Sequence, residues 1–225
     1  MKSCLSKFLV IFLASVACIA VAYFWYTKST PLPVYSPAQV NPILVDKEVR
    51  FDKKHKVQYF ELYDQHGNIT DSTFLEGKVH VADFFFTTCQ TICPIMSGKM
   101  ERVASKMDPS SDIRFLSFSV IPEEDSIPAL DAYAQAYGVN YHQWRLLTGD
   151  KQKIYDLARK SYFTLKPTEV GQGDGGSSDF IHTNNFVLVD SRQRIRGYYD
   201  GTSDLEMDRL LKDIEILLEE EKSAK

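Results

Sequence analysis

The chain has 225 residues, 44% of them hydrophobic, which is enough for one globular domain of ordinary size with a short extension. Its formal net charge is −4, and the residues that follow Lys28 carry 23 basic and 30 acidic side chains. A surface with this excess of acidic groups repels a phosphate backbone, so the composition excludes a nucleic-acid partner.

The N-terminal segment predicts a membrane anchor. Residues 8–26 form an unbroken run of 19 apolar or small residues, about the length that crosses the hydrocarbon core of a bilayer as a helix. Lys2 and Lys7 precede the run, and no acidic residue occurs before Asp46. This charge bias places the N-terminus in the cytoplasm. We therefore expect a single-pass protein of a bacterial inner membrane, with its domain on the periplasmic side.

Two other interpretations of this segment stay open. A cleaved signal peptide has a shorter apolar core of about 7–15 residues and a small-residue cleavage site, and no A-x-A site follows the run here. A lipoprotein would carry its lipid on Cys18, but Ser15 stands where a lipobox usually has Leu, and the apolar run continues past Cys18. We expect residues 1–28 to form a cytoplasmic stub and a transmembrane anchor.

A proline-rich segment follows the anchor. Residues 29–50 contain four of the nine prolines and show no strong periodicity, which is typical of a semi-rigid linker. The domain is then expected to occupy residues 51–225.

The hydrophobic pattern of this domain alternates between strands and helices. The expected strands are residues 57–63, 78–86, 113–120, 144–147, 185–190 and 194–199. The expected helices are residues 95–107, 128–137, 151–162 and 204–220, and a polar loop with four glycines spans residues 164–179. This order predicts an α/β, thioredoxin-like fold with a central mixed sheet and helices on both faces.

The predicted topology separates the four cysteines. Cys4 is cytoplasmic and Cys18 lies in the bilayer, so only Cys89 and Cys93 reach the outer side, where thiols are readily oxidised. This pair sits between a buried strand and Pro94, at the start of a helix whose N–H groups favour thiolates. Residues four apart on a helical turn share a face, with Cβ atoms about 5–6 Å apart. Two such thiolates can hold one soft copper ion or, after a modest movement, close a disulfide.

A purely structural disulfide is the alternative for this pair. A bridge between Cys89 and Cys93 would enclose only three residues, and so short a loop constrains the unfolded chain little. We therefore expect the pair to be chemically active.

Around these cysteines the sequence resembles the Sco/SenC family. That family has a C-x-x-x-C-P motif followed far downstream by an Asp-x-x-His-Thr element, and this chain has Cys89 to Pro94 and then Asp179 to Thr183. The segment Ser117 to Asp125 is similar to the family's S-x-D-P-x-x-D pattern, with Ile121 in place of the first Asp. The resemblance covers about residues 55–218, which is nearly the whole domain.

The resemblance implies a copper chaperone, a metallochaperone rather than an enzyme, with Cys89, Cys93 and His182 as ligands of one Cu(I) or Cu(II) ion. It also implies a partner, because this family serves the dinuclear copper site of cytochrome c oxidase subunit II or another copper protein, delivering copper or reducing equivalents. The Cys89/Cys93 pair would be redox-active. The other histidines lack this context and are expected to be structural or solvated: His55, His66, His80 and His142.

One acidic residue supports an enzymatic alternative. Asp83 lies in a buried strand six residues before Cys89, and thioredoxins carry at that offset an Asp that helps to move the proton of the buried thiol. A membrane-anchored thiol–disulfide oxidoreductase using Cys89 and Cys93 is therefore the second hypothesis, although Asp83 can equally be a satisfied buried carboxylate. A peroxidase of the peroxiredoxin type fits less well, because the chain lacks the P-x-x-x-T-x-x-C approach to the cysteine.

Overall fold

The computed structural model describes residues 12–13, 15–19, 31–45, 49–164 and 183–223. The chain divides into two compact units, Met1–Pro31 and Leu32–Lys225. In the first unit the described residues 12–13 and 15–19 are helical, and most of the run predicted as an anchor lies outside the described residues. Among the helices that the structure describes, none is both long and apolar enough to cross a membrane.

The second unit contains a seven-stranded sheet with helices between its strands. The strands are β1 (Glu61–Asp64), β2 (Ile69–Asp71), β3 (Val79–Phe85), β4 (Ile113–Ser119), β5 (Trp144–Thr148), β6 (Asn185–Val189) and β7 (Ile195–Asp200). The longer helices are α2 (Ile92–Ala104), α3 (Ile127–Ala136), α4 (Lys151–Asp156) and α5 (Asp204–Ser223). Short turns of other helix types are η1 (Pro37–Gln39), η2 (Pro42–Leu44), η3 (Ser72–Leu75) and the π-helical η4 (Leu157–Ser161).

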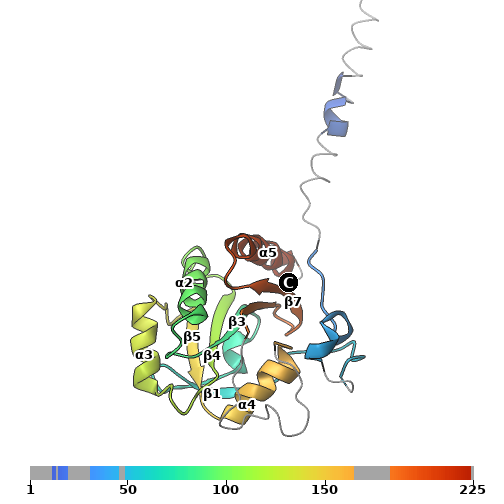
Figure 1. Ribbon diagram of the computed structural model, residues 1–225. Coiled ribbons are helices and arrows are strands. Elements are labelled where there is room, and N and C mark those ends of the chain that lie inside the picture. The colour runs from blue at the N-terminus through green and yellow to red at the C-terminus, as the bar shows by residue number, and fades with distance from the viewer. Residues whose placement is uncertain (1–11, 14, 20–30, 46–48, 165–182, 224–225) are drawn as a thin grey trace, which may run out of the picture. The chain divides into compact units, whose positions relative to one another are not determined.

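The strand order across the sheet is β2-β1-β5-β4-β3-β6-β7. β3 pairs with β4 and β4 with β5 in parallel, whereas the outer pairs are antiparallel. Helices α2, α3 and α5 pack on one face of the sheet, and α4 with η4 packs on the other (Figure 1). The predicted α/β class with a mixed central sheet and helices on both faces is confirmed.

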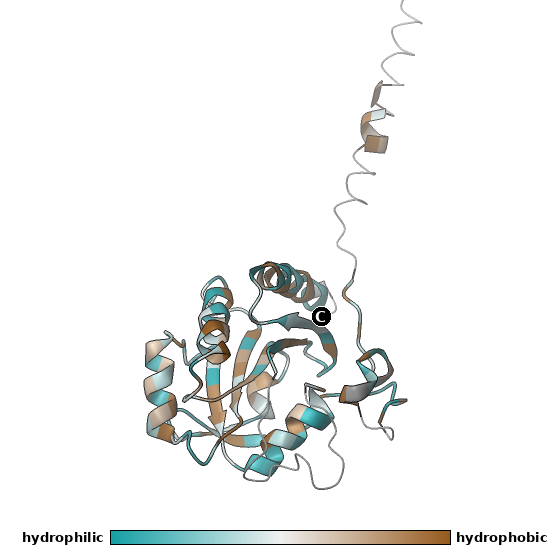
Figure 2. Cartoon of the chain, in the orientation of Figure 1, coloured by the Kyte–Doolittle hydropathy of each residue, from teal (hydrophilic) through white to brown (hydrophobic). Residues whose placement is uncertain are grey.

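Strand β3 is buried at every position because it is covered on both faces. Val81 and Phe85 join the hydrophobic cluster under α2, α3 and α5, and Ala82 and Phe84 join the cluster under α4. The central strands are accordingly largely hydrophobic in Figure 2, while α4 shows hydrophilic residues on its outer side. The alternation along β3 decides which side chains face α2, and hence the cysteines.

Residues 32–45, within the segment predicted as a linker, pack against the sheet domain. The guanidinium of Arg196, only 5% exposed, donates to the carbonyl oxygen of Leu32 (2.7 Å) and pairs with Glu220 (2.6 Å). Val45 is buried in the cluster under α4. The globular unit therefore begins at Leu32, ahead of the boundary expected at residue 51.

Several elements differ from the sequence-based prediction. Strand β1 begins at Glu61 rather than at residue 57, and the helix expected over residues 151–162 is divided into α4 and the π-helical η4. Helix α2 begins at Ile92 rather than Ile95, so Cys93 and Pro94 both lie in its first turn. Proline is tolerated there because the first N–H groups of a helix have no intrahelical acceptor. Strand β2 was not predicted, since its three residues are too few to show a periodicity.

Candidate functional site

The two cysteines lie where β3 ends and α2 begins. Val120, just after β4, donates its N–H to the carbonyl oxygen of Phe85, the last residue of β3, at 2.9 Å. The chain then turns through residues 86–91 before α2 starts. The carboxyl ends of the parallel strands β3 and β4 meet at this edge, which is where open α/β sheets usually place their ligands.

Cys89 and Cys93 contact each other through the backbone of the helix start. The N–H of Cys93 donates to the sulfur of Cys89 at 3.4 Å, and both residues are free thiols. The spacing predicted both cysteines on one helical turn, but only Cys93 is helical, and Cys89 lies before the N-cap residue Thr91. Its sulfur therefore takes the place of a capping acceptor for one of the free N–H groups of α2.

The two thiols differ in acidity. Partial burial disfavours the Cys89 thiolate, but hydrogen bonds from the thiol and amide of Cys93 and from Thr91 outweigh it and lower the pKa of Cys89 to about 7. Burial, followed by the hydrogen bond to Cys89, raises the pKa of Cys93 to about 12. Cys93 is 3% exposed, whereas Cys89 is partly exposed. At neutral pH Cys89 is thus the more ionised thiol, and the buried Cys93 is protonated.

Asp83 lies on the same side of β3 as the cysteines. Its neighbours Val81 and Phe85 pack in the cluster that contains Cys93, and alternation along the strand places Asp83 on that face. Burial raises the pKa of Asp83 to about 7, and a hydrogen bond with Ser117 opposes the shift. Its Oδ1 atom has no hydrogen-bond partner among the described residues. The charge of Asp83 also contributes to the raised pKa of Cys93, so the two groups are electrostatically coupled.

A second buried carboxylate holds the turn that precedes Cys89. Asp125 is fully buried and accepts from the N–H and the hydroxyl of Thr87, at 3.1 and 2.5 Å. Its other oxygen accepts from the hydroxyl of Ser119 at 2.6 Å. The motif resemblance included Asp125 but assigned it no role. Ile121, which replaces the family's first Asp, is buried and donates its N–H to the Ser119 hydroxyl at 3.3 Å.

His182 lies outside the described residues, so its predicted role as a ligand stays a prediction. The next residue, Thr183, is buried and leads into β6, which runs antiparallel to β3 with Val187 opposite Ala82. The chain therefore enters β6 at the edge of the sheet from which the cysteine turn leaves β3. Within the described ranges, no three His, Cys, Asp or Glu residues are grouped so that they could hold a metal ion.

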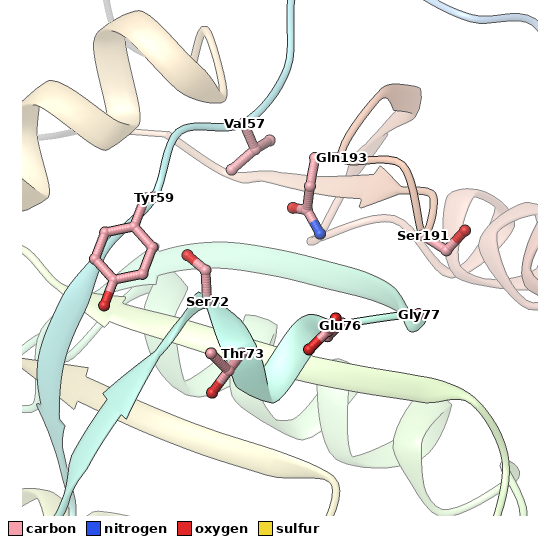
Figure 3. Close-up of a pocket in the computed structure, with 8 residues that line it drawn as sticks. All are labelled: Val57, Tyr59, Ser72, Thr73, Glu76, Gly77, Ser191 and Gln193. Atoms are coloured by element: carbon pink, nitrogen blue, oxygen red, sulfur yellow. The ribbon is translucent and has the colours of Figure 1, made fainter.

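A groove of about 370 Å³ lies away from the cysteines. Gly77, which precedes β3, and Gln193, in the β6–β7 turn, line it (Figure 3). The groove thus lies at the start of β3, whereas the cysteines lie beyond the opposite end of this strand. The described residues that line this groove include no cysteine.

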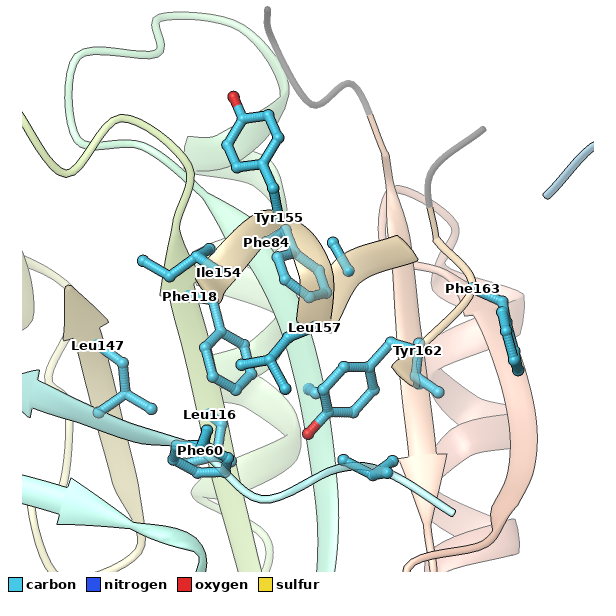
Figure 4. Packing of buried hydrophobic residues seen from close by; sticks show 14 of the residues in the cluster. Phe60, Phe84, Leu116, Phe118, Leu147, Ile154, Tyr155, Leu157, Tyr162 and Phe163 are labelled. Atoms are coloured by element: carbon cyan, nitrogen blue, oxygen red, sulfur yellow. The ribbon is translucent and has the colours of Figure 1, made fainter. Parts of the chain in front are cut away.

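His80 is a structural histidine of the core under α4. It is fully buried, and its Nε2 lies 3.0 Å from the hydroxyl of Tyr162. Burial lowers the pKa of His80 to about 3, so its ring is neutral under ordinary conditions. Tyr162 packs with Phe84 and Phe118 in the aromatic cluster of Figure 4. The Nδ1 atom of His80 is buried as well and has no hydrogen-bond partner within the part of the chain that the structure describes.

A family model and a curated relative match most of the domain. The model described as SCO1/SenC matches residues 49–219. A protein of Bacillus subtilis (strain 168), named SCO1 protein homolog, is 31% identical over 172 residues, which cover 75% of this chain and 86% of the relative.

Solved structures show the same fold. A SCO1/SenC family lipoprotein from Bacillus anthracis is 29% identical with a TM-score of 0.63, covering 75% of this chain and 98% of its own. BsSco is 31% identical with a TM-score of 0.61, and the match covers 73% of this chain and 94% of BsSco. It is described as having a disulfide switch and as a member of the Sco family of cytochrome c oxidase assembly proteins. Arabidopsis thaliana ScoI with copper bound shares the fold. It is 21% identical with a TM-score of 0.54, and the match covers 70% of this chain and 97% of ScoI.

Proposed function

The chain belongs to the SCO1/SenC family, and on that premise we propose that it is a copper-binding assembly factor for cytochrome c oxidase. The descriptions of its relatives support both parts of this proposal, since BsSco is described as an oxidase assembly protein and ScoI of Arabidopsis thaliana was crystallised with copper. The observation that carries it in this chain is the contact between the Cys93 amide and the Cys89 sulfur.

Cys89 and Cys93 fit a soft metal ion as its first two ligands. Thiolates are the protein ligands that suit Cu(I) best. With a pKa of about 7, Cys89 is already half ionised at neutral pH, whereas Cys93 must release its proton when the metal binds. We assign the third ligand to His182, whose imidazole would extend the site toward Cu(II).

Copper is the cargo of this site rather than a permanent cofactor. Cys89 is partly exposed at the open edge of the sheet, so a partner's ligand can approach the ion and exchange with it. We propose the dinuclear copper site of cytochrome c oxidase subunit II, or the site of another copper protein, as the acceptor. The net acidic charge of the domain favours attraction of a cation.

We assign residues 1–28 to a cytoplasmic stub and a membrane anchor that keeps the domain on the periplasmic side. The 19-residue apolar run and the lysines before it support this assignment. A relative is described as a lipoprotein, a class of proteins attached to membranes, which agrees with a membrane-attached role.

The second candidate function is thiol–disulfide exchange, and the coupling of Asp83 to Cys93 favours it. The Cys89 thiolate would attack a disulfide of the partner and form a mixed disulfide, releasing one partner thiolate. Cys93 would give its proton to Asp83 and displace the second partner sulfur. The partner ends as a dithiol, and the Cys89–Cys93 pair ends as a disulfide, so two electrons pass to the partner.

One substitution separates the two functions. Asp83→Asn removes the charge at nearly constant volume, so it should slow disulfide reduction without weakening copper binding, because the loss of this charge makes Cys93 no harder to deprotonate. In cells that lack the wild-type gene, a copper-delivery role predicts that the Asp83→Asn protein restores the spectrum of the oxidase copper centre, with Cys89→Ser as the inactive control. If the Asp83→Asn protein restores that spectrum no better than the Cys89→Ser protein does, the protein acts mainly as a reductant.

A further inference from the structure

Asp125 joins the two strand ends on which the cysteine turn is built. Its carboxylate receives four hydrogen bonds from three donors. The N–H of Thr87, after β3, reaches both oxygens, the Thr87 hydroxyl reaches one of them, and the hydroxyl of Ser119, the last residue of β4, reaches the other. Ser119 lies opposite Phe85 in the parallel pairing of these strands. Hydrogen bonds to a charged acceptor are roughly twice as strong as neutral ones, and burial strengthens them further.

The position of Cys89 depends on this carboxylate because Thr87 is the nearest residue of the turn that is held by strong hydrogen bonds. Phe86 and Cys89 are only partly buried against the cluster under α2, α3 and α5. Only Thr88 separates Thr87 from Cys89, and both Thr88 and Gln90 are exposed and bring no core packing to the turn. The N–H of Cys89 makes a long bond of 3.4 Å to the carbonyl oxygen of Phe86. The turn is therefore fixed on one side at Thr87 and on the other by the start of α2.

We propose that Asp125, acting through Thr87, is the residue that positions Cys89 in front of the Cys93 amide. This inference rests on the proposed function, in which Cys89 is a copper ligand. A ligand must be held within about 0.5 Å of its productive place, which an exposed turn of this length cannot achieve alone. Asp125 touches neither cysteine, so its role is one of support: it sets the distance from the Cys89 sulfur to Cys93.

The chain offers a matched pair of substitutions for testing this role. Thr73 donates its N–H and its hydroxyl to one oxygen of Asp71, at 2.8 and 2.5 Å, which is the same bidentate arrangement as that of Thr87 and Asp125. Thr73 lies in η3 and lines the groove at the start of β3, away from the cysteines. Thr87→Val and Thr73→Val each remove one hydroxyl bond to a carboxylate, but only the first affects the cysteine turn.

The experiment uses the full chain, reduced and metal-free, with three variants: Thr87→Val, Thr87→Ser and Thr73→Val. Alkylation of Cys89 by iodoacetamide at pH 7 is followed by mass spectrometry, and Cu(I) affinity is measured by competition with a chromophoric chelator. Thr87→Val should slow the alkylation of Cys89 about fivefold and weaken Cu(I) binding about tenfold, because the Cys93 amide no longer lies against the sulfur. Thr87→Ser should restore both values, and Thr73→Val should match the wild type.

Wild-type alkylation and affinity in folded Thr87→Val would overturn the positioning role. Asp125→Ala, if it folds, should show the same two changes as Thr87→Val. A wild-type protein that binds no copper would instead refute the proposed function. The alkylation rates would still decide whether Asp125 holds the turn, so the two failures are distinguishable.

Discussion

The backbone N–H of Cys93 lies 3.4 Å from the sulfur of Cys89. This contact brings together a partly exposed residue of a turn and a buried residue of the first helical turn of α2. The contact stabilises the thiolate of Cys89, while burial keeps the sulfur of Cys93 protonated. The site therefore offers a metal ion one ionised sulfur and one that ionises only on binding.

The first prediction concerns the reactivity of the metal-free cysteines. Because the pKa of Cys89 is lowered to about 7, its alkylation rate should rise with pH and reach half its maximum near pH 7. Cys93 should remain unreactive across the neutral range, because it is buried and its pKa is raised to about 12. Mass spectrometry of the modified peptides measures both. Faster modification of Cys93 than of Cys89 would reverse the assigned roles.

The second prediction concerns the stability cost of Asp83. Its pKa is raised to about 7 in the folded protein, above the value near 3.8 in the unfolded chain, so the unfolded chain ionises first as the pH rises. Protonated Asp83 therefore makes its full contribution to the stability of the folded state below about pH 4. This contribution is lost as the pH rises through about 7. Asp83→Asn should therefore raise the melting temperature more at pH 7.5 than at pH 4. An equal change at both pH values would show that Asp83 does not titrate in this range.

The third prediction concerns His182, which the resemblance to the SCO1/SenC family implies as the third ligand. An imidazole must be neutral to bind a metal, so Cu(II) affinity should fall as the pH drops below about 6.5. His182→Ala should weaken Cu(II) binding more than Cu(I) binding, because two thiolates alone can satisfy the softer ion. Competition titrations in both oxidation states measure the difference, with His142→Ala as a control. Unchanged affinities in His182→Ala would remove this residue from the site.

The sequence predicted the parts of the fold that depend on local pattern. Strand β3 is apolar except for His80 and Asp83, and the helix that follows it is marked by Pro94, so the cysteine turn between them was expected. The packing of residues 32–45 was not predicted, because it depends on Arg196, which is distant in sequence. The bonding of Asp125 to Thr87 was missed for the same reason: it arises only when β3 and β4 pair.

The most direct test of the central claim is an anaerobic titration of the reduced full chain with Cu(I). We predict one copper ion bound per chain, and no stoichiometric binding by the variant that combines Cys89→Ser with Cys93→Ser. A matched variant with Cys18→Ser should retain the wild-type stoichiometry, because Cys18 lies outside the sheet domain. Stoichiometric binding of copper by the double variant would contradict the assignment of the copper site to Cys89 and Cys93.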